Sequence, residues 1–89
     1  PAVIISNNRN NELSETVTVI PITSNISKIY PFETFISKDM GGLEVDSKVK
    51  CNQIRTIDKR RLIKFLCKIQ EDKVKEIEEA LKIHLGFEI

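Results

Sequence analysis

Short runs of β-branched and aromatic residues, separated by turn-forming residues, fill the chain before residue 70 and limit it to a small β-rich fold. These runs predict strands over residues 1–6, 16–24, 32–37, 47–57 and 64–69. The first two strands are expected to pair, because only the amide-rich turn NNRNNEL separates them. Pro21 predicts a bulge or a sheet edge near the end of the second strand, since proline cannot donate a ladder hydrogen bond. A further turn is expected over residues 39–42.

A single amphipathic helix is predicted to close the chain. Between Glu71 and Leu85 the apolar residues recur at helical spacing, at Val74, Ile77, Ala80, Leu81 and Leu85. Acidic residues occupy the first turn of this segment, and Gly86 stands where a helix is expected to end. Several short strands followed by one helix predict a small barrel or sandwich with an appended helix.

The length of 89 residues allows one domain, spanning 1–89. Hydrophobic residues make up 40% and charged residues 30%, as in soluble globular chains, and no apolar run is long enough to cross a bilayer. No membrane partner is therefore expected. Cys51 and Cys67 lack the spacing of a zinc site, so they are interpreted as reduced thiols of an intracellular protein that needs no metal or cofactor.

Positive charge is concentrated in the middle of the chain. Residues 48–64 hold seven cations and one acid, whereas the chain from Gln70 onward holds six acids and three lysines. A local basic patch favours a phosphate-bearing partner, and the alternative is a solvated strand edge protected by lysines.

The stretch CNQIRTIDKRRL mixes core-like apolar residues with amides and cations, which is typical of a strand with one polar or anionic face. In the predicted strand over 47–57, Val49 and Cys51 would point one way, while Lys50 and Asn52 would share the other face. Asp58 is predicted to cap the short turn that follows.

Several of these elements, in this order, resemble the MazF/PemK (Kid) family of bacterial toxins. The matching strings are PAVIISNN, TVTVIPITS, YPFE, GLEVDSKVKCNQIRTIDKRRL and ALKIHLGFE. The resemblance runs almost from end to end, and the string CNQIRTIDKRRL corresponds to a string that is specific to the family.

The resemblance implies an SH3-like barrel of the CcdB/MazF/Kid type with a C-terminal helix. It also implies a cytoplasmic homodimer, the toxin of a type II toxin–antitoxin system, which is inhibited by a MazE-like antitoxin. Such toxins cut single-stranded mRNA at specific sequences without metal, through attack of the ribose 2′-hydroxyl. The products carry 2′,3′-cyclic phosphate and 5′-hydroxyl ends.

The resemblance also assigns candidate site residues. Thr23 matches the catalytic threonine of the family, and its hydroxyl could donate to a phosphoryl oxygen or orient the 2′-hydroxyl. Without the family, it would be interpreted as a strand-end threonine that satisfies a backbone group. The expected RNA-binding residues are Ser24, Lys50, Asn52, Gln53 and Arg55.

Two of these residues depart from the pattern in some relatives. Lys50 and Asn52 occupy positions where those relatives place an arginine and a carboxylate as acid and base. Lys50 can still bind phosphate, but Asn52 cannot accept a proton as a carboxylate would. Asn52 and Gln53 are therefore expected to read base edges in single-stranded RNA, although both could be ordinary strand or bulge residues.

The remaining polar and aromatic candidates receive structural interpretations. Arg55 could hold a phosphate, but pairing with Asp58 is the expected role, and residues 59–61 are expected to form a solvated face. Tyr30 and Phe32 could stack on bases, but they are expected to belong to the core. His84 is assigned no role.

Members of the family normally begin about one strand earlier, with a glycine-rich loop that ends in a catalytic arginine directly before the position of Pro1. The resemblance therefore implies that residues 1–89 taken alone are an N-terminally incomplete domain, able to bind RNA or antitoxin as a dimer but not to cleave. A different alternative is a gyrase-inhibiting toxin on the same fold, which would stall DNA replication and leave transcripts intact.

Overall fold

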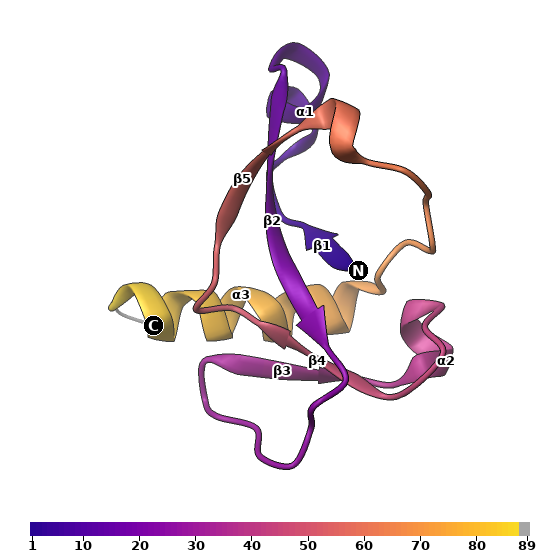
Figure 1. Cartoon of the computed structure of the whole chain (residues 1–89). Helices are drawn as coiled ribbons and strands as arrows, with labels where there is room; N and C mark the ends of the chain where they lie inside the picture. Colours follow the sequence, from indigo (N-terminus) through magenta and orange to yellow (C-terminus); the bar gives the residue numbers. More distant parts are fainter. Residues whose placement is uncertain (88–89) are drawn as a thin grey trace.

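The computed structural model describes residues 1–87, which form a bent antiparallel sheet and a long C-terminal helix (Figure 1). The strands are β1 (Ala2–Ile4), β2 (Thr16–Thr23), β3 (Glu33–Ile36), β4 (Ser47–Lys50) and β5 (Arg55–Asp58). The helices are α1 (Asn8–Leu13), α2 (Lys38–Gly41), the 3-10 helix η1 (Lys59–Arg61) and α3 (Glu71–Leu85). Glu88, the last residue of the string ALKIHLGFE, lies outside the described residues, as does Ile89.

Strand β2 is the centre of the sheet because three strands pair with it. One edge of β2 pairs with β1, which confirms the predicted pairing of the first two strands. The other edge pairs first with β5, through residues 16–19, and then with β4, through Ile22 and Thr23. The amide of Ile22 donates to the carbonyl of Pro1, on the β1 edge of β2. Backbone nitrogens alternate between the two edges of a strand, so the nitrogen of Pro21 points to the other edge, where neither β5 nor β4 pairs with it. The missing amide of Pro21 therefore costs no ladder hydrogen bond.

The prediction of one long strand over 47–57 is wrong, because the chain turns after Lys50. The amide of Gln53 donates to the carbonyl of Lys50 at 2.9 Å, and residues 51–54 separate β4 from β5. The turn is needed because β4 and β5 pair with different halves of the bent strand β2. The strand alternation that would place Lys50 and Asn52 on one face therefore ends at Lys50.

The two turns predicted earlier in the chain, over NNRNNEL and residues 39–42, are short helices. In NNRNNEL the side chain of Asn7 accepts a hydrogen bond from the amide of Asn10, which caps and starts α1. Residues 38–41 form the single-turn helix α2, which Gly42 ends in the left-handed conformation. Amide-rich and glycine-rich segments favour both structures, so composition alone does not separate them.

The predicted strand over 64–69 is also wrong, since no described strand pairs with this segment. Its apolar residues are only partly covered: Phe65 is 79% exposed, and the preceding Ile63 is 97% exposed. The segment instead passes close to α2, where the thiol of Cys67 donates to the carbonyl of Met40 at 3.3 Å. Residues 64–69 therefore have a sequence typical of a strand but stay irregular, because no described strand pairs with them.

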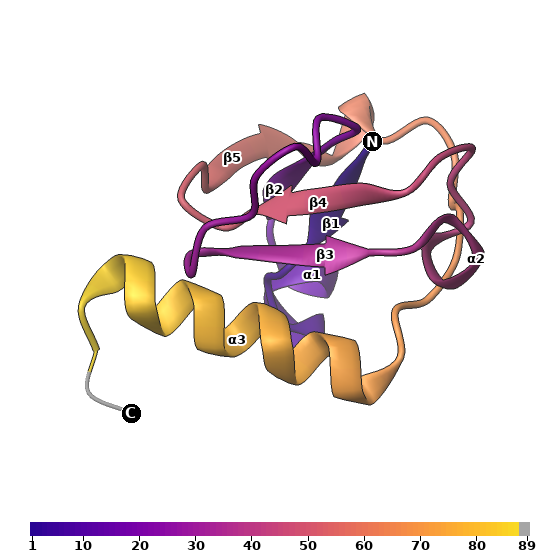
Figure 2. The same cartoon turned by 90° about the horizontal axis from the view of Figure 1, so that it is seen from below.

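The core lies between the sheet and α3, which runs along β3 (Figure 2). Its fully buried side chains are Ile20, Ile36, Val49 and Cys51, and α3 adds Ile77 and Ala80. The predicted helix is confirmed, with Glu71 and Asp72 in its first turn and Gly86 as its left-handed cap. Leu85 departs from the predicted apolar face, because half of it is exposed.

Replacing Gly42 with alanine is expected to lower the free energy of unfolding by about 2 to 3 kcal/mol. Gly42 has a φ of 62°, and a Cβ atom there would lie 3.2 Å from the carbonyl oxygen of Leu66. Gly86 is a matched control, since its φ is 76° and a Cβ atom would meet no described atom within 4 Å. Gly86→Ala is therefore expected to cost about 1 kcal/mol. Unfolding in denaturant measures both variants. Equal losses of unfolding free energy for Gly42→Ala and Gly86→Ala would show that the contact with Leu66 does not restrict position 42.

Candidate functional site

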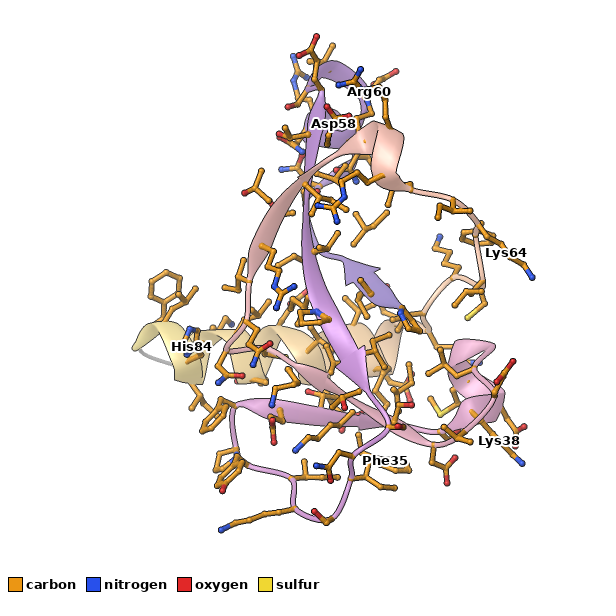
Figure 3. The ribbon with its side chains drawn as sticks, in the orientation of Figure 1. Phe35, Lys38, Asp58, Arg60, Lys64 and His84 are labelled. Carbon is orange, nitrogen blue, oxygen red and sulfur yellow. The ribbon has the colours of Figure 1, made fainter. Side chains whose placement is uncertain are left out.

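A groove of about 690 Å³ opens beside the end of β2. Thr23 and Ser24 line it, together with Pro1, Ser47 and Lys64. Lys64 comes from the irregular segment between η1 and α3 (Figure 3). The groove also contains Glu44, and the hydroxyl of Ser47 already donates to the carbonyl of Val45 at 3.0 Å. Thr23, Ser24 and Lys64 are the lining residues whose side chains could donate to a phosphate oxygen. Sequence reasoning did not select Lys64, because its position beside Thr23 depends on the course of an irregular segment.

Thr23 is half-buried at the last position of β2. Its hydroxyl oxygen accepts a hydrogen bond from the amide of Asn25 at 3.3 Å, which is the local role expected of a strand-end threonine. Because the oxygen is the acceptor in that bond, the hydroxyl proton is still free to donate. Thr23 can therefore fill its structural role and contact a ligand in the groove at the same time.

Strand register brings Thr23 and Lys50 onto the same face of the sheet. Thr23 lies directly opposite Lys48, and Lys50 is two residues further along β4. The neighbouring pair of Ile22 and Val49 points to the other side, where Val49 is fully buried in the core. The outer face of β4 therefore presents lysines beside Thr23.

The two lysines share a buried carboxylate, that of Glu33 on β3. The ammonium of Lys48 lies 2.9 Å from Oε1 of Glu33, and that of Lys50 lies 3.5 Å from Oε2. The Glu33 side chain is only 1% exposed. Burial acts to raise the pKa of Glu33, but the amide of Tyr30, the hydrogen bond and charge of Lys48 and the charge of Lys50 outweigh it and lower the pKa. Sequence reasoning missed this cluster, because it depends on the β3–β4 register.

The other predicted RNA-binding residues lie at the β4–β5 turn and beyond it, outside the groove of Thr23. Asn52 and Gln53 are half-buried in the turn, and Arg55 is exposed at the start of β5. The Oδ1 atom of Asn52 is buried and has no hydrogen-bond partner among the described residues. An unpaired buried acceptor is costly, and a donor from a ligand or partner would reach it only after the turn rearranges.

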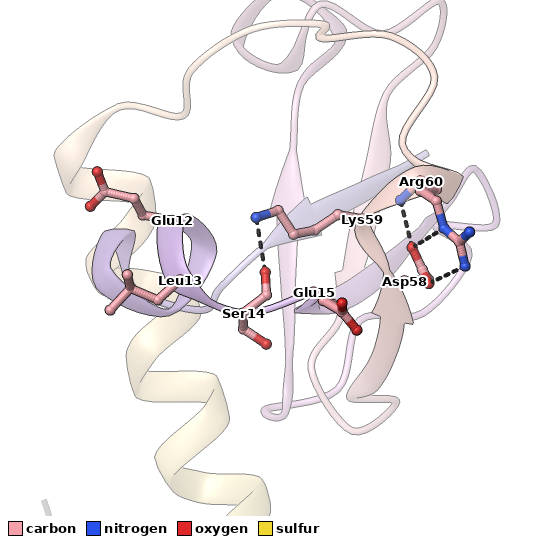
Figure 4. Close-up of a pocket in the computed structure, with 7 residues that line it drawn as sticks. All are labelled: Glu12, Leu13, Ser14, Glu15, Asp58, Lys59 and Arg60. Atoms are coloured by element: carbon pink, nitrogen blue, oxygen red, sulfur yellow. Dashed lines mark hydrogen bonds and ion pairs between the residues drawn. The ribbon is translucent and has the colours of Figure 1, made fainter.

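The predicted pairing of Arg55 with Asp58 is wrong. The two residues are three positions apart on β5 and so point to opposite faces. Asp58 instead accepts two hydrogen bonds from the guanidinium of Arg60, at 3.1 and 2.9 Å (Figure 4). The side-chain bond from Arg60, followed by the bond from its amide, lowers the pKa of Asp58. The amide bond also caps η1, which confirms the predicted capping role of Asp58.

A second hollow, of about 530 Å³, lies between the end of α1 and η1 (Figure 4). Glu12, Glu15 and Asp58 line it together with Lys59 and Arg60. Its two cations already have partners within the fold: Arg60 binds Asp58, and the ammonium of Lys59 donates to the carbonyl of Ser14 at 2.9 Å. This hollow contains none of the predicted site residues.

The expectation that Tyr30 belongs to the core is wrong, because 42% of its surface is exposed. Its ring stacks on that of half-buried Phe32, with centroids 5.2 Å apart and planes 4° apart. The ammonium of Lys28 lies 4.7 Å from the centre of the Tyr30 ring. His84 is exposed near the end of α3 (Figure 3).

Residues 1–87 contain no group of three or more histidine, cysteine or carboxylate side chains that could hold a metal ion. None of the helices in that range has the length and apolar character needed to cross a membrane. Both cysteines are free thiols. Burial above all raises the pKa of the Cys51 thiol, so this residue acts as an apolar core group next to the turn.

Comparison with known proteins identifies the same kind of domain across the chain. The family model described as "PemK-like, MazF-like toxin of type II toxin-antitoxin system" matches residues 1–85. Among curated proteins, Endoribonuclease MazF9 of Mycobacterium tuberculosis is 40% identical over 92 residues, which cover 98% of this chain and 78% of that relative.

Two solved structures show the same fold. Mycobacterium tuberculosis toxin MazF-mt6 has a TM-score of 0.91 at 21% identity, over 100% of this chain and 88% of that one. A MazE-MazF structure from Deinococcus radiodurans has a TM-score of 0.82 at 28% identity, over 99% of this chain and 82% of that one. These matches confirm the predicted MazF-type barrel with a C-terminal helix. The family match and the curated relative together show that this chain belongs to the PemK-like, MazF-like toxins of type II toxin–antitoxin systems.

Proposed function

We propose that the protein is a toxin endoribonuclease that cleaves single-stranded mRNA at specific sequences without a metal ion. The observation that carries this proposal is the position of Thr23, which lines a groove with Ser24 and Lys64 and whose strand register places it on the same face of the sheet as Lys50. The curated relative is itself named an endoribonuclease. Hydroxyl and ammonium groups at a strand end suit a reaction in which the substrate supplies its own nucleophile.

In this reaction the ribose 2′-oxygen forms a bond to the adjacent phosphorus, and the bond from phosphorus to the 5′-oxygen breaks. The 2′-hydroxyl loses a proton and the departing 5′-oxygen gains one. Thr23 would donate to a phosphoryl oxygen or orient the 2′-hydroxyl, and Lys50 would offset negative charge on the phosphate. Ser24, Gln53 and Arg55 would hold neighbouring nucleotides, and the half-buried Asn52 would read a base edge once the turn exposes its amide.

The register of β1 supports a role for the residue that the family places before Pro1. Ala2 pairs with Pro21, and the carbonyl of Pro1 accepts a hydrogen bond from Ile22 at 3.0 Å. Continuing this antiparallel register by one residue brings a residue joined to Pro1 opposite Thr23. Side chains directly opposite each other in such a pair are about 5 Å apart at Cβ. An arginine there would supply the charged group that Thr23 lacks.

Partners and location follow from the same family membership. The Deinococcus radiodurans structure contains MazE with MazF, which supports a MazE-like antitoxin as the inhibitor of this protein. We further propose a homodimer that acts on RNA in the cytoplasm.

The test is to incubate protein made from its complete reading frame with single-stranded RNA in excess chelator. Cleavage into fragments with 2′,3′-cyclic phosphate and 5′-hydroxyl ends is expected, because the 2′-oxygen attacks without metal. Cleavage that stops when chelator is added would contradict the proposal. Intact transcripts together with stalled DNA replication after induced expression would instead support gyrase inhibition.

A further inference from the structure

The buried carboxylate of Glu33 binds its two lysines with different oxygen atoms and in different ways. Oε1 accepts from the ammonium of Lys48 at 2.9 Å and from the amide of Tyr30 at 3.0 Å. Oε2 meets the ammonium of Lys50 at 3.5 Å, a longer contact that is an ion pair but not a hydrogen bond. One oxygen is therefore firmly held within the fold, and the other has a loose partner.

The surroundings of the two lysines differ in the same sense. The Lys48 side chain is 8% exposed, and its ammonium also donates to the carbonyl of Lys28 at 2.7 Å. The Lys50 side chain is 28% exposed and stands at the end of β4, next to the turn that carries Asn52. Lys48 is fixed between β3 and the β2–β3 loop, whereas the ammonium of Lys50 can reach solvent.

The charges of the cluster leave it able to take an anion. Two ammonium groups face one carboxylate, so the cluster carries one excess positive charge. A long, partly exposed ion pair is weak, and a phosphate near Lys50 can replace its contact with Oε2. Loss of that contact leaves Oε1 bound to Lys48 and Tyr30, so the loop and the strand stay in place.

We propose that Glu33 is a positioning residue: its carboxylate pairs with Lys50 in the free protein, and Lys50 leaves it to bind a phosphate when single-stranded RNA is bound. This proposal rests on the proposed function and deepens it, because it names a residue that controls the same site without touching substrate. The ion pair between Glu33 and Lys48 stays in place, and only Lys50 changes its partner.

The test is a double-substitution cycle on RNA binding, using a non-cleavable 2′-deoxy analogue across a range of salt concentrations. Lys50→Gln is expected to weaken binding about tenfold and to reduce the slope of log affinity against log salt by about 0.7, the loss of one phosphate contact. Glu33→Gln keeps the shape of the side chain and frees Lys50, so binding is expected to tighten about threefold. In the Lys50→Gln background, Glu33→Gln is expected to change binding by less than twofold. Lys38→Gln is the matched control, because Lys38 is an exposed lysine on α2.

The results separate this inference from the proposed function. Wild-type protein that does not bind single-stranded RNA would overturn both. Binding in the wild type, with Glu33→Gln either weakening it or shifting it equally in both backgrounds, would overturn the role of Glu33 alone.

A measurement on the wild type covers the case in which Glu33→Gln fails to fold. The carboxyl carbon resonance of Glu33 is followed by NMR against pH, with and without the RNA analogue. Lys50 helps to lower the pKa of Glu33, so its departure is expected to move the titration to higher pH in the complex. An unchanged titration would overturn the proposal.

Discussion

Replacing Lys48 with methionine is expected to lower the free energy of unfolding by about 3 to 5 kcal/mol, because the substitution leaves a buried carboxylate without its closest partner. Lys48 and Glu33 are both buried, and their charged atoms are 2.9 Å apart. The substitution also leaves the carbonyl of Lys28 without its donor. Unfolding in urea, followed by circular dichroism, measures the loss.

Lys38→Met is the matched control, since Lys38 is exposed and the substitution keeps its backbone bond to Asp46. A change within about 0.5 kcal/mol is expected for it. Adding Glu33→Gln to Lys48→Met is expected to recover part of the loss, because the unpaired charge is then removed. A Lys48→Met protein as stable as Lys38→Met would contradict the account of this cluster.

The same cluster predicts how stability depends on pH. The pKa of Glu33 is lowered by folding, so its contribution is fully present above the unfolded-state pKa and is lost as pH falls through the folded-state pKa. Wild-type protein is therefore expected to lose stability on acidification more steeply than Lys48→Met. Parallel acid profiles for the two proteins would show that Lys48 does not stabilise the charged form of Glu33.

Replacing Thr23 with valine is expected to lower kcat/KM for RNA cleavage by about 100-fold or more, as the loss of one transition-state donor commonly does. Valine keeps the shape of threonine but removes the hydroxyl of this groove-lining residue. Binding of a non-cleavable RNA is expected to change little, because the substitution leaves the proposed contacts of Lys50 and Arg55 with the RNA phosphates in place. Single-turnover cleavage and equilibrium binding separate the two effects.

Thr23→Ser is the matched control, because it keeps both the hydroxyl and the local bond from the amide of Asn25. Its activity is expected to remain within about tenfold of wild type. Equal activity of Thr23→Val and wild type would limit Thr23 to its structural role.

The elements that could be predicted from the sequence are those whose pattern is local. Helix α3 carries its own period, its acidic first turn and Gly86, so its bounds match the prediction. The split of 47–57 into β4 and β5 could not be predicted, because it follows from the bend of β2 and from the two partners that share one edge of it. The run over 64–69 looks like a strand in sequence, but no described strand pairs with it.

The same division holds for the candidate site. Thr23 and Ser24 follow from the family strings, and the structure adds Lys64 to their groove. Glu33 and Lys48 are distant in sequence and are joined only by the pairing of β3 with β4. Arg55 and Arg60 are both close to Asp58 in sequence, so the sequence does not decide which of them pairs with it. The chain changes from strand to η1 after Asp58, and this change brings Arg60 to the carboxylate.

The central claim, that the substrate's own sugar oxygen is the nucleophile, is tested most directly by two RNA oligonucleotides that differ in one atom. One carries a ribose 2′-hydroxyl at the cleaved position and the other a 2′-deoxy sugar, and both are given to the same protein in chelator. We expect the two to bind with similar affinity and only the first to be cut. Cleavage of the deoxy substrate at a comparable rate would contradict the account.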